Sequence, residues 1–167
     1  MQLSELVRAL PRHELRGSGN VDIRSIELDS RRVGGGALFV CLEGLARNGH
    51  DFAATAVNQG AVALLVRVPV EVSPPVPQVM VADTREAMAR VSAAFYHNPG
   101  RELCAIGVTG TNGKTTVTHL VQSVARVDGR ATEVMGTLGA TAGEGYRSTG
   151  FTTPEAPTFQ RVLREAV

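Results

Sequence analysis

The chain has 167 residues, a hydrophobic content of 43% and a formal net charge of +1 from 17 basic and 16 acidic residues. This composition is typical of one folded domain or two small ones, and the near balance of charge without a basic block excludes a duplex nucleic-acid-binding protein. No apolar run is long enough to span a membrane and the N-terminus lacks signal-peptide character, so we expect a cytoplasmic protein with no membrane partner.

The first 98 residues alternate apolar runs with helical patterns, which predicts a small α/β domain. Helical spacing over Leu3–Leu10 indicates a first helix that ends at Pro11. Loops are predicted at residues 29–36, 44–51 and 69–77, where polar residues, glycines or prolines gather. We expect strands over Val21–Leu28, Ala37–Leu42, Ala61–Val68 and Gln78–Ala82, and helices over Phe52–Gln59 and from an Asp83 cap to about Tyr96.

A turn signal at Asn98-Pro99-Gly100 separates this region from a second pattern of alternating strands and helices, so we place a domain boundary between residues 98 and 99. A parallel nucleotide-binding sheet normally needs more strands than this second part offers. We therefore expect a truncated domain that leaves part of its hydrophobic surface exposed. Its predicted elements are strands at Leu103–Val108 and Ala131–Met135, helices at Val117–Val127 and from about Ala156 to Val167, and a loop at Thr141–Gly150.

The cysteines and histidines offer no sign of a metal site. Cys41 and Cys104 both fall in predicted strands, so we expect two buried free thiols rather than a disulfide framework or zinc ligands. The 4 histidines lack metal-ligand spacing, and we interpret them as surface residues or satisfied core residues.

The segment Gly107–Thr116 joins the predicted strand Leu103–Val108 to the helix that follows. Strand, glycine-rich turn, Lys-Thr and helix form the layout of a loop that wraps a nucleotide phosphate. Glycines let several N–H groups turn toward one anion, Lys114 would reach the terminal phosphates, and the Thr115 hydroxyl would ligate Mg²⁺. The general pattern puts its first glycine where this chain has Val108, so an ordinary strand-to-helix turn remains the alternative.

Several segments together resemble the Mur ligases, the ATP-dependent amino-acid ligases of bacterial cell-wall synthesis. The loop Thr109–Thr116 is similar to that of the family, in which the first glycine is displaced in the same way. Phe151–Glu155 contains a Thr-Thr-Pro-Glu sequence that is similar to the MurE type. The N-terminal part resembles the uridine-nucleotide-binding domain of the MurE and MurF types at Leu28–Val33, Leu38–Gly44, Asn48–Phe52 and Gln59–Ala63, although Asn48 stands where Asp is common.

The resemblance implies a fold and an activity. Residues 1–98 would form a UDP-MurNAc-binding domain, and residues 99–167 the first part of an ATP-binding central domain with a parallel sheet. The enzyme would be a monomer that uses ATP and Mg²⁺ to add a third amino acid, diaminopimelate or lysine, to UDP-N-acetylmuramoyl-L-alanyl-D-glutamate through an acyl phosphate. Further metal ligands, a modified lysine and an amino-acid-binding domain are implied beyond Val167, so we expect the 167 residues alone not to turn over.

The resemblance also implies roles for individual residues. Lys114 would stabilise charge on the transferring phosphoryl group, and Thr115 would hold one Mg²⁺. Gly110, Thr111, Asn112, Gly113 and Thr116 would cradle the ATP phosphates. The substrate-binding residues would be Leu28, Ser30, Leu45, Ala46 and Arg47 around the uridine nucleotide, and Thr152 and Thr153 at the sugar and peptide.

Other interpretations of the same residues stay open. Asp29-Ser30-Arg31 also fits a turn in which Asp29 bonds its own backbone, and Thr153 followed by Pro154 also fits a capped helix start. A small kinase or nucleotide-driven switch would need a strand ending in Asp for the metal, and none follows residue 116. A non-catalytic module that binds only a UDP-sugar is the third possibility.

Overall fold

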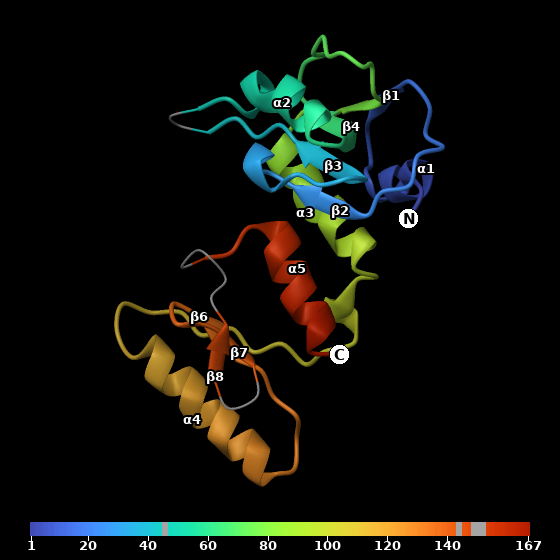
Figure 1. Ribbon diagram of the computed structural model, residues 1–167. Coiled ribbons are helices and arrows are strands. Elements are labelled where there is room, and N and C mark those ends of the chain that lie inside the picture. The colour runs from blue at the N-terminus through green and yellow to red at the C-terminus, as the bar shows by residue number, and fades with distance from the viewer. Residues whose placement is uncertain (45–46, 143–144, 148–152) are drawn as a thin grey trace. The chain divides into compact units, whose positions relative to one another are not determined.

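The computed structural model describes residues 1–44, 47–142, 145–147 and 153–167 (Figure 1). The chain divides into two compact units, Met1–Phe95 and Tyr96–Val167. Both units mix helices with strands and the first contains a parallel sheet, which confirms the predicted α/β class. No helix in these described ranges is long and apolar enough to cross a bilayer.

A five-stranded sheet forms the centre of the first unit, in the order β1-β5-β4-β3-β2. Its neighbours from β2 to β5 pair in parallel, and only β1 runs antiparallel to β5. The strand β1 was not predicted from the sequence, because this short edge strand has exposed charged residues at both ends. The strands are β1 (Glu14–Arg16), β2 (Ser25–Glu27), β3 (Ala37–Val40), β4 (Ala61–Val66) and β5 (Gln78–Met80), so the four predicted strands are confirmed in shorter form.

Side chains from both faces of this sheet are buried. Phe39 and Cys41 pack on one side with Val57 of the helix α2, while Leu38 and Val40 point to the opposite side by strand alternation. All four residues of β3 are therefore buried, as is typical of a parallel strand covered on both faces. The helices of this unit are α1 (Leu3–Leu6), α2 (Ala53–Asn58) and α3 (Thr84–Phe95), with 3-10 turns η1 (Val7–Ala9), η2 (Ser30–Arg32) and η3 (Gly49–Phe52).

Helix ends in the first unit follow local sequence signals. The Asp83 carboxylate accepts hydrogen bonds from the backbone N–H groups of Arg85 and Glu86 at 2.8 and 3.0 Å, which confirms the predicted cap of α3. Gly60 follows α2 with a φ of +113°, and its N–H donates to the Val57 carbonyl at 3.0 Å. Glycine accepts this left-handed conformation without steric cost, so the helix ends where the sequence predicted.

The second unit contains two longer helices and a small antiparallel sheet of order β6-β7-β8. Thr141 pairs with Tyr146 across β7 and β8, so the predicted loop over Thr141–Gly150 is wrong for these strands. Most of the predicted strand Ala131–Met135 is also irregular, because β6 begins only at Met135. The elements are η4 (Pro99–Arg101), α4 (Lys114–Val127), β6 (Met135–Gly136), β7 (Gly139–Ala142), β8 (Gly145–Arg147) and α5 (Ala156–Glu165).

The predicted strand Leu103–Val108 is not formed. Its residues lie outside any strand, and no segment among the described residues pairs with them. A strand needs a neighbour to bond its backbone groups, so an apolar run alone is not sufficient. Cys104 is exposed here, which makes the expectation of a second buried thiol wrong, and Ile106 is 66% exposed. The expectation of exposed hydrophobic surface is confirmed by Ile106 and by the α4 residues Val117, Leu120, Val124 and Val127.

Candidate functional site

The first candidate site is the exposed loop from Gly110 to Thr116, which leads into α4. Gly110 and Gly113 have φ angles of +147° and +77°, in a region that favours glycine. The first helical bond runs from the Val117 N–H to the Gly113 carbonyl, at 2.9 Å. Within the described residues, the N–H groups of residues 110–116 donate to no backbone carbonyl. Unpaired amides ahead of a helix are the donors that an anion such as a phosphate chain uses.

Lys114 and Thr115 stand in the first turn of α4. The Lys114 ammonium folds back over the loop and donates to the carbonyls of Gly110 and Thr111 at 2.6 and 3.3 Å. Thr115 is exposed, so its hydroxyl oxygen is accessible to a hard cation such as Mg²⁺. This donor set of amides, one ammonium and one hydroxyl suits a magnesium-bound polyphosphate. In the parts of the chain that the structure describes, no cluster of three His, Cys, Asp or Glu residues offers a different metal site.

The second candidate site lies at one edge of the sheet in the first unit. Leu28 and Ser30 follow β2, and Arg47 lies in the loop that follows β3. Because β2 and β3 are parallel neighbours, their carboxyl ends meet at the same edge, where ligands of open α/β sheets bind. Ser30 is buried, Leu28 is half-buried and Arg47 is exposed. The predicted site residues Leu45 and Ala46 lie outside the described residues.

Asp29 fixes the backbone around Ser30. Its carboxylate accepts from the Arg31 backbone N–H at 3.0 Å and from the Arg31 guanidinium at 2.9 and 2.7 Å. These hydrogen bonds from Arg31, which outweigh the partial burial of the carboxyl group, lower the pKa of Asp29 to about 2. The alternative interpretation of this segment as a turn is therefore confirmed, and the turn holds Ser30 at the end of β2.

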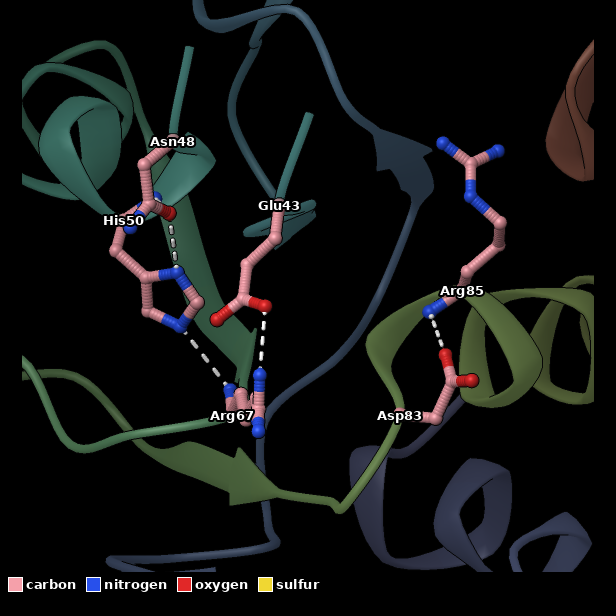
Figure 2. A network of polar contacts seen from close by, with 6 residues as sticks. All are labelled: Glu43, Asn48, His50, Arg67, Asp83 and Arg85. Atoms are coloured by element: carbon pink, nitrogen blue, oxygen red, sulfur yellow. Dashed lines mark hydrogen bonds and ion pairs between the residues drawn. The ribbon is translucent and has the colours of Figure 1, made fainter. Parts of the chain in front are cut away.

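Four residues beside this edge form a network that sequence analysis did not predict (Figure 2). The His50 ring contacts the Asn48 side-chain oxygen at 2.8 Å and accepts the Arg67 backbone N–H at 3.0 Å. The Arg67 guanidinium donates to Glu43 at 2.8 Å. His50 is buried and hydrogen-bonded, so of the two interpretations given for the histidines, surface residue or satisfied core residue, the second applies to it. A single arginine at the end of the apolar run Ala61–Val68 was the available signal for Arg67.

The Thr-Thr-Pro-Glu segment is only partly described. Thr152 lies outside the described residues, and Thr153 is exposed. The prediction that Thr153 caps the last helix is wrong, because α5 begins at Ala156 with Glu155 as the preceding residue. Pro157 explains this start: its fixed φ suits the first helical turn, where its missing N–H costs nothing.

Comparison with known proteins identifies the family of this chain. The model of the Mur ligase family, catalytic domain, matches residues 22–96, and that of the Mur ligase middle domain matches residues 108–167. The chain belongs to the Mur ligase family. The resemblance found in the sequence is thereby confirmed, and the middle-domain match contains both the loop 110–116 and Thr153.

Relatives of this Mur ligase chain carry the name UDP-N-acetylmuramoyl-L-alanyl-D-glutamate–2,6-diaminopimelate ligase. The one from Geobacillus thermodenitrificans is 44% identical over 100% of this chain and 34% of its own length. The one from Halalkalibacterium halodurans is 43% identical over 99% of this chain and 34% of its own length. The chain thus spans about a third of these relatives, whose names agree with the resemblance of Phe151–Glu155 to the MurE type.

Solved structures give the same fold. MurF from Acinetobacter baumannii matches with a TM-score of 0.67 and 24% identity over 98% of this chain and 32% of its own. A UDP-N-acetylmuramoyl-L-alanyl-D-glutamate–2,6-diaminopimelate ligase matches with a TM-score of 0.72 and 23% identity over 99% of this chain and 34% of its own. MurF from Thermotoga maritima, solved in complex with ADP, matches with a TM-score of 0.54 and 23% identity, over 84% of this chain and 29% of its own.

Proposed function

We propose that this chain supplies the uridine-nucleotide site and the ATP phosphate site of a MurE-type ligase. The observation that carries the proposal is the loop 110–116, whose amides have no backbone acceptor among the described residues and which runs into the first turn of α4, where Lys114 and Thr115 lie. The same segment falls in the match to the Mur ligase middle domain. Residues 1–98 would bind UDP-MurNAc, and residues 99–167 would bind ATP.

The proposed reaction forms an amide bond in two steps. The free side-chain carboxylate of the D-glutamyl residue attacks the γ-phosphorus of ATP, and ADP leaves. The amine of the incoming amino acid then attacks the acyl phosphate, loses a proton and expels inorganic phosphate. Both steps depend on positioning and on neutralising negative charge, which an anion-binding loop with an ammonium group provides.

Within this reaction the chain's own residues hold the phosphates. Lys114 would exchange the carbonyls of Gly110 and Thr111 for phosphate oxygens, and the free amides would bind the rest of the chain of phosphates. The Thr115 hydroxyl would hold Mg²⁺, which neutralises charge on the phosphates when bound. Ser30, Leu28 and Arg47 would bind the uridine nucleotide at the sheet edge.

The names of the relatives support diaminopimelate as the third amino acid. ATP and UDP-linked intermediates are cytoplasmic compounds, so we place the reaction in the cytoplasm, and we expect a monomer. The incoming amino acid has no assigned site in these residues. We therefore propose that the 167 residues bind both nucleotides without completing the reaction.

The test uses the single lysine of the chain. Reductive ¹³C-methylation labels Lys114 and the Met1 amine and keeps both positive. A magnesium complex of a non-hydrolysable ATP analogue should shift the Lys114 methyl signal in an NMR titration. The Met1 signal should stay in place, because that amine bonds Asp22 in the other unit.

A parallel calorimetric titration with UDP-N-acetylmuramoyl-L-alanyl-D-glutamate tests the uridine site. Binding of both compounds supports the ligase. If the Lys114 signal does not shift at millimolar analogue, the proposed ATP site is ruled out. A module that binds only the UDP-sugar would then remain. Binding of the ATP analogue alone would instead favour a kinase or a nucleotide-driven switch.

A further inference from the structure

We propose that His50 is a positioning residue for the uridine diphosphate end of the substrate: its neutral ring holds both arms of the loop 43–48 against the end of β4. This inference rests on the proposed function, in which Arg47 of that loop contacts the uridine nucleotide.

The two described arms of this loop, residues 43–44 and 47–48, lie side by side, and we refer to these arms as the hairpin 43–48. Glu43 and Asn48 form an antiparallel bridge, and the Gly49 N–H donates to the Leu42 carbonyl at 2.7 Å. Nearer the tip, the Gly44 N–H donates to the carbonyl of Arg47 at 3.0 Å. These hydrogen bonds fix the backbone position of Arg47.

A cycle of polar contacts connects the base of the hairpin to the end of β4 (Figure 2). The Asn48 side-chain oxygen contacts the His50 imidazole, the imidazole accepts the Arg67 backbone N–H, and the Arg67 guanidinium donates to Glu43. Because Asn48 and Glu43 are paired in the antiparallel bridge, the four residues form a closed cycle of contacts. Both arms of the hairpin are therefore attached to the residue that follows β4.

The hydrogen bonds determine which ring nitrogen carries the proton. The backbone N–H of His50 donates to the Asn48 side chain at 3.1 Å, and an N–H can only face an oxygen, so the orientation of the amide is fixed. The same oxygen lies 2.8 Å from Nδ1, which must then be the donor. Nε2 is left as an acceptor, and it receives the Arg67 N–H at 3.0 Å. The ring is neutral, with its proton on Nδ1.

A second proton on the His50 imidazole would break this cycle of contacts. Protonated Nε2 would point its N–H at the N–H of Arg67, so the imidazole would have to move away. Burial lowers the pKa of His50, as does the positive charge of Arg67, while the carboxylates of Glu43 and Asp51 act in the opposite direction. The contribution of the neutral ring is therefore complete above the ordinary histidine pKa of about 6.5 and is lost as the pH falls through the lowered pKa.

The test measures affinity for UDP-N-acetylmuramoyl-L-alanyl-D-glutamate by calorimetry from pH 4.5 to 8. If only the neutral His50 form binds, the affinity falls about tenfold for each pH unit below the His50 midpoint. That midpoint is read independently from ¹⁵N chemical shifts of the ring, which should show Nδ1 protonated and Nε2 unprotonated at pH 8. The replacement Asn48→Asp keeps the acceptor oxygens and adds a charge that favours imidazolium, so both midpoints should move together to higher pH.

The exposed His13 provides the matched control, since His13→Gln should leave both midpoints unchanged. A binding curve that stays flat while His50 titrates would overturn the inference and leave the proposed uridine site intact. So would the opposite tautomer in the native chain, a result that does not depend on how any variant folds. If the wild-type chain fails to bind the uridine compound at every pH, the proposed function fails and this inference falls with it.

Discussion

Cys41 and Cys104 have the same side chain in opposite surroundings. Cys41 directly follows β3 inside the core, and burial raises the pKa of its thiol to about 12. Cys104 is exposed in the irregular segment before the phosphate loop. Both cysteines were predicted to be buried, because each lies in an apolar run. Only the pairing of β3 with its neighbours distinguishes them.

Thiol labelling tests this difference. We expect iodoacetamide at pH 8 to modify Cys104 in the native chain and to leave Cys41 unmodified, because the reactive thiolate of Cys41 is both rare and inaccessible. Intact-mass spectrometry should show one added group under native conditions and two in denaturant. In Cys104→Ser the native chain should gain none. Rapid native modification of Cys41 would contradict its burial.

His50 shows what sequence predicts at a single residue and what it does not. The absence of metal-ligand spacing indicated a surface residue or a satisfied core residue, and the structure shows the second. The neutral form of His50 did not follow from the sequence, because the partner that excludes a proton on Nε2 is the backbone N–H of Arg67, 17 residues away. Contacts of this kind depend on strand order and register, which no local pattern encodes.

At the scale of elements, Gly49 decides whether the hairpin 43–48 can close. A Cβ at this position would lie 2.6 and 2.7 Å from the backbone N and O of Leu42. Backbone atoms cannot move aside as a flexible side chain can. We expect Gly49→Ala to destabilise the chain by roughly 1–3 kcal/mol, the range for an overpacked site, as measured by urea unfolding.

Gly34 supplies the control for that change, since a Cβ there meets nothing within 4 Å. Gly34→Ala should alter the free energy of unfolding by less than about 0.5 kcal/mol, as is usual for open surface sites. Equal effects of the two substitutions would show that the hairpin base tolerates a side chain. Uridine-nucleotide affinity should follow the same order, with loss only in Gly49→Ala.

Helices and strands differed in how far the sequence predicted them. The helices α3 and α4 were predicted well, because their periodicity and the Asp83 cap are local signals. Leu103–Val108 was predicted wrongly, because a strand forms only where a neighbour supplies hydrogen bonds. The pairing of β7 and β8 was missed for a related reason: glycine and alanine make up most of β7, and β8 has only 3 residues, so both segments give little strand signal.

At the scale of the whole chain, the two candidate sites lie in separate compact units. Lys114→Ala should therefore weaken binding of an ATP analogue by roughly 10- to 100-fold, the usual loss for a charged hydrogen bond of about 1.5–3 kcal/mol. The Kd for UDP-N-acetylmuramoyl-L-alanyl-D-glutamate should stay within a factor of about 2. Calorimetry on each ligand measures both effects.

Arg126→Ala is the charge-matched control for that experiment, since Arg126 lies in the last turn of the same helix. It should leave both affinities unchanged. A parallel loss of both affinities in Lys114→Ala would contradict two independent sites. The loop 110–116 was predicted from its motif and the uridine-site residues from the resemblance to the family, whereas the network behind the hairpin 43–48 emerged only with the fold.

The outward face of α4 has a practical consequence for anyone who handles this chain. Val117, Leu120, Val124 and Val127 recur along one side of the helix, and Val127 is 91% exposed. Attraction between such faces weakens on cooling and strengthens with sulfate or phosphate salts. Samples for spectroscopy are therefore best kept cold, dilute and free of those salts, and light scattering should rise first on warming.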